Sequence, residues 1–119
     1  MSDDATGNST SHFTLTTMVR DSSLELIAAG ELDMTAAFKF ESRVDALLSA
    51  GGVQAVVVDL AQVDFVDSAG LGALLSVRDH ARRRGIDLQL ARISDPVRKL
   101  IDLTGIGDLA GDVTDHRRR

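Results

Sequence analysis

The sequence of 119 residues contains no cysteine, no tryptophan, no tyrosine and only four phenylalanines. Without cysteine the chain cannot form a disulfide scaffold, a thiolate zinc site or a cysteine nucleophile, and it suits a reducing compartment. With so few aromatic rings it has almost nothing from which to build a base-stacking platform or an aromatic ligand cage. Composition therefore excludes several chemistries and names none.

Positive charge is also scarce, because 13 Lys and Arg against 18 Asp and Glu give a net charge of −5. Binding to nucleic acid or to an anionic membrane needs clustered positive charge. No apolar run approaches the length of about 20 residues that spans a bilayer. The first residues, Met1-Ser2-Asp3-Asp4, lack the features of a secretory signal. We expect a cytoplasmic protein with no membrane partner and no direct nucleic-acid partner.

The length and an apolar content of 44% fit one domain with its own core. Residues 1–11 are rich in Ser, Thr, Asp and Gly without apolar periodicity, which predicts a disordered N-terminal tail. The domain is expected over residues 12–114, and residues 115–119 are expected to form a charged C-terminal tail.

Hydrophobic periodicity and turn residues predict an α/β domain in which helices pack against a mixed β-sheet. The predicted order is β-β-α-β-α-β-α with a possible short last strand. The unbroken run Val56-Val57-Val58 is typical of a strand that is covered by helices on both faces. The predicted elements are strands at 13–20 and 24–29, a helix at 34–50 capped by Asp33 or Thr35, a strand at 53–60, a helix at 68–85, a strand at 86–93, a helix from Ser94 or Asp95 to Gly105, and a short strand within 106–114.

One segment between a strand and a helix, residues 64–72, is unusual because Gly70 and Gly72 fall in the first turns of the helix. Each glycine costs a helix about 1 kcal/mol relative to alanine, so the glycines need another explanation. Close packing of helix on sheet is one explanation, and access for a partner is the other. Ser68 is expected to present its hydroxyl here, and it is also a candidate N-cap.

Other candidate residues have simpler explanations. Asp64 and Asp67 could form an acid-base pair, or bind a metal with Asp33, but capping and solvation explain them better. His80 is predicted to be a surface residue rather than a ligand or base. Phe38 is predicted to lie at the edge of the core rather than to anchor a partner.

The sequence resembles the STAS domain family, and within it the bacterial anti-sigma factor antagonists. The element Asp67-Ser68-Ala69-Gly70-Leu71-Gly72 after a hydrophobic strand is the most specific match. The matching stretches span most of residues 13–106 in the expected order. They are Gly30-Glu31-Leu32-Asp33, Val56-Val57-Val58-Asp59-Leu60, Val63-Asp64-Phe65-Val66, the element just named, Ser94-Asp95-Pro96-Val97-Arg98-Lys99-Leu100 and Leu103-Thr104-Gly105-Ile106.

The resemblance implies a regulator that is not an enzyme and uses no cofactor or metal. The unphosphorylated protein would bind an anti-sigma factor that is also a serine kinase, and so release the sigma factor. The kinase would phosphorylate Ser68 and end the complex, and a serine phosphatase would reset it. Asp33 would lie beside the phosphorylation site. The partner-binding residues implied are Asp33, Asp67, Ser68, Ala69, Gly70, Leu71 and Gly72.

Three further expectations concern the wider function. The family usually continues into a final helix for which this chain has little length, so a homodimer through exposed apolar surface is a possible consequence. A second hypothesis is a STAS-like structural or regulatory subunit of a transporter or signalling assembly without phosphoryl control. A third is a small hydrolase that uses Ser68, although the sequence offers no placed base for it.

Overall fold

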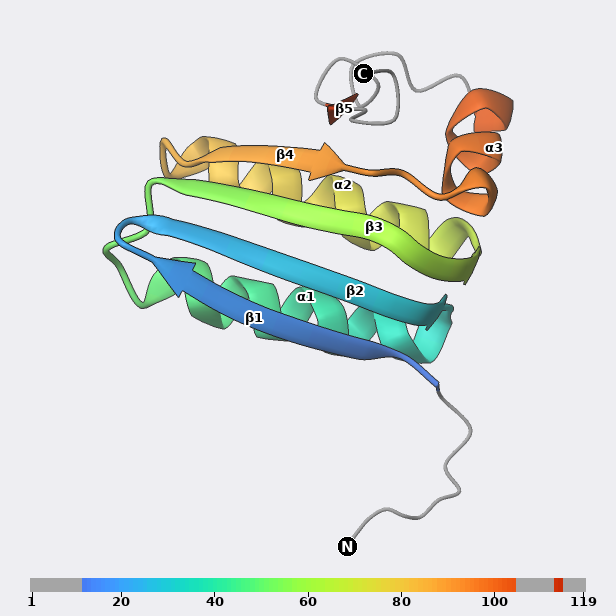
Figure 1. Cartoon of the computed structure of the whole chain (residues 1–119), viewed down its shortest axis with the longest axis horizontal. Helices are drawn as coiled ribbons and strands as arrows, with labels where there is room; N and C mark the ends of the chain where they lie inside the picture. Colours follow the sequence, from blue (N-terminus) through green and yellow to red (C-terminus); the bar gives the residue numbers. More distant parts are fainter. Residues whose placement is uncertain (1–11, 105–112, 115–119) are drawn as a thin grey trace, which may run out of the picture.

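A computed structural model describes residues 12–104 and 113–114, which form a five-stranded mixed sheet with three helices (Figure 1). The sheet order is β1-β2-β3-β4-β5, in which β1 and β2 are antiparallel and the other pairs are parallel. The predicted α/β fold and element order are confirmed, including a short last strand. The elements are β1 (Thr14–Arg20), β2 (Ser23–Leu32), α1 (Met34–Ser49), β3 (Ala55–Val66), α2 (Ser68–Arg83), β4 (Asp87–Ala91), α3 (Asp95–Thr104) and β5 (Val113–Thr114).

The two predicted tails, 1–11 and 115–119, and the expected helix end at Gly105 lie outside the described residues. Within the described part of the chain, no helix is long and apolar enough to cross a membrane.

The first two strands form an antiparallel hairpin, whose tight turn contains Asp21 in the left-handed region at φ 53°. Alternate residues of β1 turn toward the helices, so Leu15 is half-buried against the core. The ring of Phe13, just before β1, meets the ring of Phe40 edge-on at 6.2 Å. These contacts hold α1 against the β1 end of the sheet.

The prediction that β3 is covered by helices on both faces is wrong. Helices α1 and α2 lie on one face, where they bury side chains such as Leu26 and Val58 (Figure 1). The units β2-α1-β3 and β3-α2-β4 step in the same direction along the sheet. Because such crossovers are right-handed, both helices must arrive on the same face. An apolar run in the sequence indicates that a strand is buried, but it does not show in which direction the crossovers step along the sheet.

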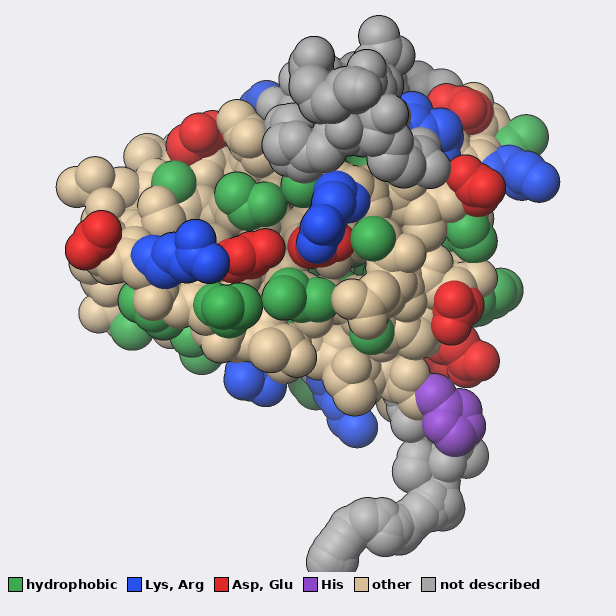
Figure 2. Space-filling model, in the orientation of Figure 1, with side chains coloured by type: hydrophobic (Ala, Val, Ile, Leu, Met, Phe, Trp, Pro, Cys, Tyr) green, Lys and Arg blue, Asp and Glu red, His purple; other side chains and the backbone are tan. Residues whose placement is uncertain are grey.

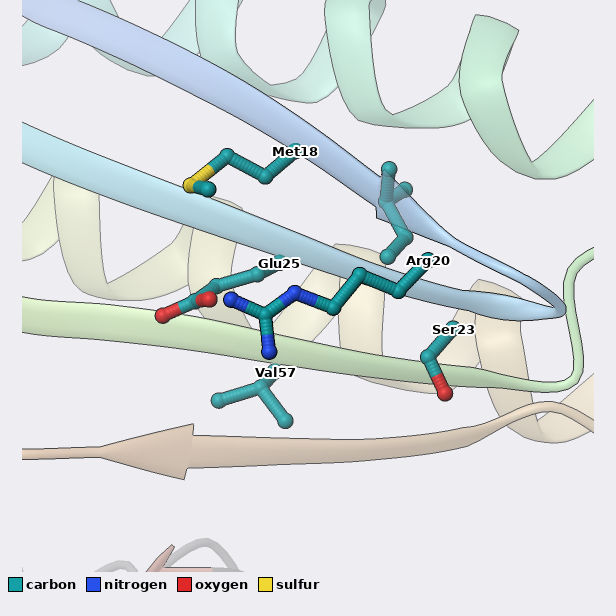
Figure 3. A pocket seen from close by; sticks show the side chains of 6 residues that line it. Met18, Arg20, Ser23, Glu25 and Val57 are labelled. Atoms are coloured by element: carbon teal, nitrogen blue, oxygen red, sulfur yellow. The ribbon is translucent and has the colours of Figure 1, made fainter.

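On the opposite face of the sheet, charged side chains lie across apolar side chains. Figure 3 shows Arg20 extending from β1 across the sheet toward Glu25 and Val57, beside a hollow of about 240 Å³. Figure 2 shows apolar patches between basic and acidic groups on this face. Charged side chains with long alkyl stems thus cover part of the area that a second helical layer would have covered.

Strand β3 is longer than predicted because it contains two irregularities in its pairing with β2. Residues Ile27 and Ala29 pair with Asp59 and Gln62, so β3 holds one extra residue there, and a second shift follows before Phe65. Each bulge breaks the alternation by which a strand is recognised from sequence. The predicted end at residue 60 was therefore too early, and the strand reaches the start of α2.

Asp59 holds the first of these bulges. Its carboxylate is buried, with 1% of the residue exposed, and it accepts a hydrogen bond from the Ala61 N–H at 3.0 Å. The Arg92 guanidinium, at the end of β4, also donates to this carboxylate through Nε at 3.0 Å and through Nη2. The hydrogen bond to Asp59 and the negative charge of Asp59 raise the pKa of Arg92. The paired charges compensate the cost of burying a carboxylate.

Candidate partner-binding site

The candidate site lies where β2 and β3 end side by side and each passes into a helix. Leu32 and Val66 are paired across the two strands, and an aspartate follows each of them. The side chain of Asp33 accepts a hydrogen bond from the Ala36 N–H at 3.0 Å, and that of Asp67 accepts one from the Gly70 N–H at 2.9 Å. Two N-caps therefore lie together at the carboxyl edge of a parallel sheet, where ligands and partners commonly bind.

Ser68 is the first residue of α2 and is exposed. The interpretation of Ser68 as the N-cap is wrong, because Asp67 has the extended backbone of a cap (φ −111°, ψ −174°) and its carboxylate binds the helix. The Ser68 hydroxyl is consequently left out of the cap. An exposed hydroxyl on the first residue of a helix lies near N–H groups that have no partner within the helix.

The two glycines of this helix play different parts. A Cβ at Gly70 would lie 2.1 Å from the carbonyl oxygen of Leu32 and 2.9 Å from a methyl carbon of Val66, so only glycine lets the helix approach the strand ends this closely. A Cβ at Gly72 would meet nothing within 4 Å. Gly70 thus has the packing role, whereas Gly72 opens the surface four residues after Ser68.

Of the other residues predicted to bind a partner, Asp33, Asp67 and Ala69 are half-buried, and Leu71 is buried together with Gly70. Leu71 and Gly70 lie beneath the surface, so they can influence a partner only through the position of the helix backbone. Ser68 and Gly72 are the exposed members of the predicted set.

A comparison with protein-family models matches the STAS domain model over residues 15–117. The chain belongs to the STAS domain family. It is 30% identical over 93 residues to an anti-sigma-B factor antagonist of Staphylococcus epidermidis, covering 78% of this chain and 85% of the relative. It is 29% identical over 86 residues to the anti-sigma-B factor antagonist of Listeria monocytogenes, covering 72% of this chain and 75% of the relative.

Solved structures agree with this assignment. The anti-sigma factor antagonist SpoIIAA in its unphosphorylated form has the same fold, with a TM-score of 0.72 and 24% identity, and the match covers 87% of this chain and 86% of that chain. The resemblance found in the sequence is thereby confirmed at the level of family and fold.

Two exposed apolar side chains lie in the first turns of α1, the helix that packs beside α2 in this STAS domain, and the sequence interpretation missed them. Met34 is 73% exposed and Phe38 is 74% exposed, so the prediction that Phe38 lies at the edge of the core is wrong. By helical spacing, both residues lie on the same side of α1 as Asp45, and Asp45 contacts His80 of α2. This side of α1 therefore borders α2. Phe38 does not belong to the apolar stripe of its helix, and this was the signal from which its exposure could have been predicted.

We call Met34, Phe38, Ser68 and Gly72 the junction surface. Met34 and Ser68 are each the second residue after the paired strand ends, and Phe38 and Gly72 each follow one helical turn later. The surface combines an apolar ridge on α1 with a hydroxyl and an open glycine on α2. Such a mixture suits docking of a protein better than binding of a small ligand, which requires a concave pocket.

The structure gives no support to the acid-base or metal interpretations of the aspartates. Asp67 is engaged as a cap and Asp64 is exposed on β3. Among residues 12–104 and 113–114, no three His, Cys, Asp or Glu side chains are grouped so that they could hold a metal ion.

His80 is half-buried rather than a simple surface residue, which corrects the prediction. Its Nδ1 lies 2.6 Å from a carboxylate oxygen of Asp45, and Arg84 donates from Nε to Nε2 at 3.1 Å. Because Nε2 accepts, Nδ1 carries the proton that is donated to Asp45. His80 lies about 18 Å along the helix from Ser68 at 1.5 Å per residue, too far to act as its base. It links α1 to α2 instead.

Proposed function

We propose that this STAS domain is an anti-sigma factor antagonist that is controlled by phosphorylation of Ser68. The unphosphorylated protein binds an anti-sigma factor with serine kinase activity and thereby frees a sigma factor. Transfer of a phosphoryl group from ATP to the Ser68 hydroxyl ends this complex, and a serine phosphatase restores the original state. The protein itself acts as a binding partner and substrate, not as an enzyme.

The observation that carries this proposal is the exposed position of Ser68 outside the cap of α2. A kinase must bring the hydroxyl into line with the γ-phosphate of ATP, and the lack of a side chain at Gly72 leaves room for it. Because the carboxylate of Asp67 alone caps the helix, modification of Ser68 leaves the cap bond to Gly70 intact. A phosphate at a helix N-terminus is also favoured by the helix dipole.

The charge around Ser68 supports a switch that acts on binding and not on folding. A phosphate adds roughly −1.5 to −2 charge at pH 7 beside two aspartates, Asp33 and Asp67, at the same edge of the sheet. The apolar side chains of Met34 and Phe38 must lose water when a partner docks. A dianion beside them makes that desolvation costly and repels acidic groups of the partner.

The names of the relatives support the partner class. The relatives from Staphylococcus epidermidis and Listeria monocytogenes are called antagonists of an anti-sigma factor, and the sequence similarity covers most of each protein. We therefore assign an anti-sigma factor as the partner in preference to a transporter subunit.

Incubation with the cognate anti-sigma factor and ATP tests the proposal. We expect the intact mass to rise by one phosphate, and the affinity for the anti-sigma factor to fall at least about tenfold, which corresponds to roughly 1.4 kcal/mol. Ser68→Ala should bind without being phosphorylated. Ser76→Ala, which changes another exposed serine of α2, is the matched control and should be phosphorylated like the wild type.

The two parts of the proposal fail separately. Full phosphorylation of Ser68→Ala would overturn the site assignment and leave the antagonist role in place. Absence of any complex between the unphosphorylated protein and the anti-sigma factor would overturn the antagonist role itself.

A further inference from the structure

Within the described residues, the outer edge of the sheet at β1 has neither the proline nor the bulge with which proteins often protect an edge strand. Of the described strands, β1 pairs with β2 alone, so its other side presents unpaired backbone N–H and C=O groups. Its sequence, Thr-Leu-Thr-Thr-Met-Val-Arg, has four β-branched residues, no proline and no charge before Arg20. Such a strand is well suited to receive another strand.

A groove runs between this edge and helix α1. It has a volume of about 160 Å³ and is lined by Phe13, Leu15, Lys39, Phe40 and Arg43. Arg43 reaches the strand, since its Nη2 donates to the Thr17 hydroxyl at 3.4 Å. The groove therefore has an apolar floor and two basic side chains along its helical wall.

The charge at this edge is positive although the whole chain carries −5. Lys39 and Arg43 lie on one side of α1, whereas Glu41 and Asp45 follow the stripe that borders α2, where Asp45 contacts His80. Figure 2 shows basic side chains, and no acidic ones between them, along the lower edge where β1 and α1 lie. The edge thus combines open backbone groups with cationic side chains.

We propose that the β1 edge is a second interaction surface that binds an extended acidic segment of a partner protein as an added strand. The backbone of the segment would pair with β1. Its side chains on the helical side would alternate between the apolar floor of the groove and the cations of Lys39 and Arg43. A second copy of this chain fits less well, because pairing two β1 edges would bring like charges together.

This surface is separate from the junction surface, since Lys39 and Arg43 face β1 whereas Met34 and Phe38 border α2. The inference does not depend on the proposed role of Ser68. Phosphorylation of Ser68 by the anti-sigma factor should proceed equally in a variant of the β1 edge, so the two proposals can fail independently.

The test uses a fluorescent peptide of about eight residues, the length of a typical strand, with the sequence Val-Thr-Glu-Thr-Val-Thr-Glu-Thr, so that Val and Glu alternate along one face of the added strand. Matched peptides carry Gln or Lys in place of each Glu. We expect the Glu peptide to bind most tightly by fluorescence anisotropy and to weaken as salt is added. Hydrogen exchange should show new protection of the amides of β1. Lys39→Gln should weaken binding on the order of twofold to fivefold, as expected for an exposed charge pair.

Lys99→Gln makes the same chemical change at an exposed position on α3 and should leave the affinity unchanged. Equal binding of the Gln and Glu peptides, unchanged affinity of Lys39→Gln, or protection confined to residues outside β1 would each overturn the proposal. A dimer of the protein alone in which the amides of β1 are already protected from exchange would also overturn it, because the edge would then belong to a second copy.

Discussion

The two strand-to-helix junctions of this STAS domain are built alike and differ at a few positions. The pairing of Leu32 with Val66 aligns β2-α1 with β3-α2, and an aspartate caps each helix through the N–H group three residues later. The next residue is Met34 in one junction and Ser68 in the other. Farther along, Ala36 corresponds to Gly70, and Phe38 corresponds to Gly72.

These differences separate the structural part of the motif from the part that a partner can meet. The caps are common to both junctions, so they explain how the helices begin and not why one junction carries a serine. Gly70 is required because α2 crosses the end of β2 at close range. Ser68 and Gly72 have no comparable packing role, and our proposal assigns them to recognition by a partner.

The largest expected effect comes from Gly70→Ala. The new Cβ would collide with the backbone carbonyl of Leu32, so we expect a loss of about 2 kcal/mol or more in the free energy of unfolding, seen in urea denaturation. Gly72→Ala is the control and should stabilise the protein by about 0.5–1 kcal/mol, because its Cβ meets open space and alanine favours the helix. Equal effects of the two substitutions would contradict the division of roles between the glycines.

A smaller effect is expected from removing either cap. Asp33→Ala and Asp67→Ala should each cost about 1 kcal/mol of stability, since each deletes one side-chain bond to a helix N–H. Thermal unfolding of the two variants side by side measures the comparison directly. A much greater loss of stability in Asp67→Ala than in Asp33→Ala would mean that the carboxylate of Asp67 does more than cap α2.

The smallest effect on stability is expected for a charge on the first helical residue. Ser68→Asp and Met34→Asp both put a carboxylate near a helix N-terminus, which is worth about 0.3–1 kcal/mol in favour of the folded state. Melting temperatures should therefore stay within a few degrees of the wild type, while Ser68→Asp weakens binding to the anti-sigma factor. A large drop in the melting temperature of Ser68→Asp would indicate that Ser68 serves folding instead of regulation.

Much of this architecture could be predicted from local patterns. The helix that begins at Met34 was predicted with Asp33 as a candidate cap, because an aspartate before an apolar helical stripe satisfies free N–H groups. The choice between Asp67 and Ser68 as the second cap could not be made in this way. Both residue types cap well and they are adjacent, so only the backbone angles of the folded chain distinguish them.

The features that were mispredicted depend on contacts between distant segments. The bulge at Asp59 is held by Arg92, which lies 33 residues further along the chain and enters through β4. The exposed face of β3 follows from the common direction of two crossovers. Neither relation leaves a periodic pattern within one segment, so hydrophobic periodicity cannot report it.

The sequence by itself determined the family, the order of strands and helices, and the presence of an unusual serine between an aspartate and two glycines. These depend on side-chain periodicity and local capping chemistry, which act over a few residues. Only the tertiary structure decided that Gly70 is there for packing, that Met34 and Phe38 are exposed, and that two basic side chains line the groove beside β1. The physical reason is that segments far apart in the chain pack together. Their packing sets which side chains are buried, which backbones approach closely and which charged side chains become neighbours.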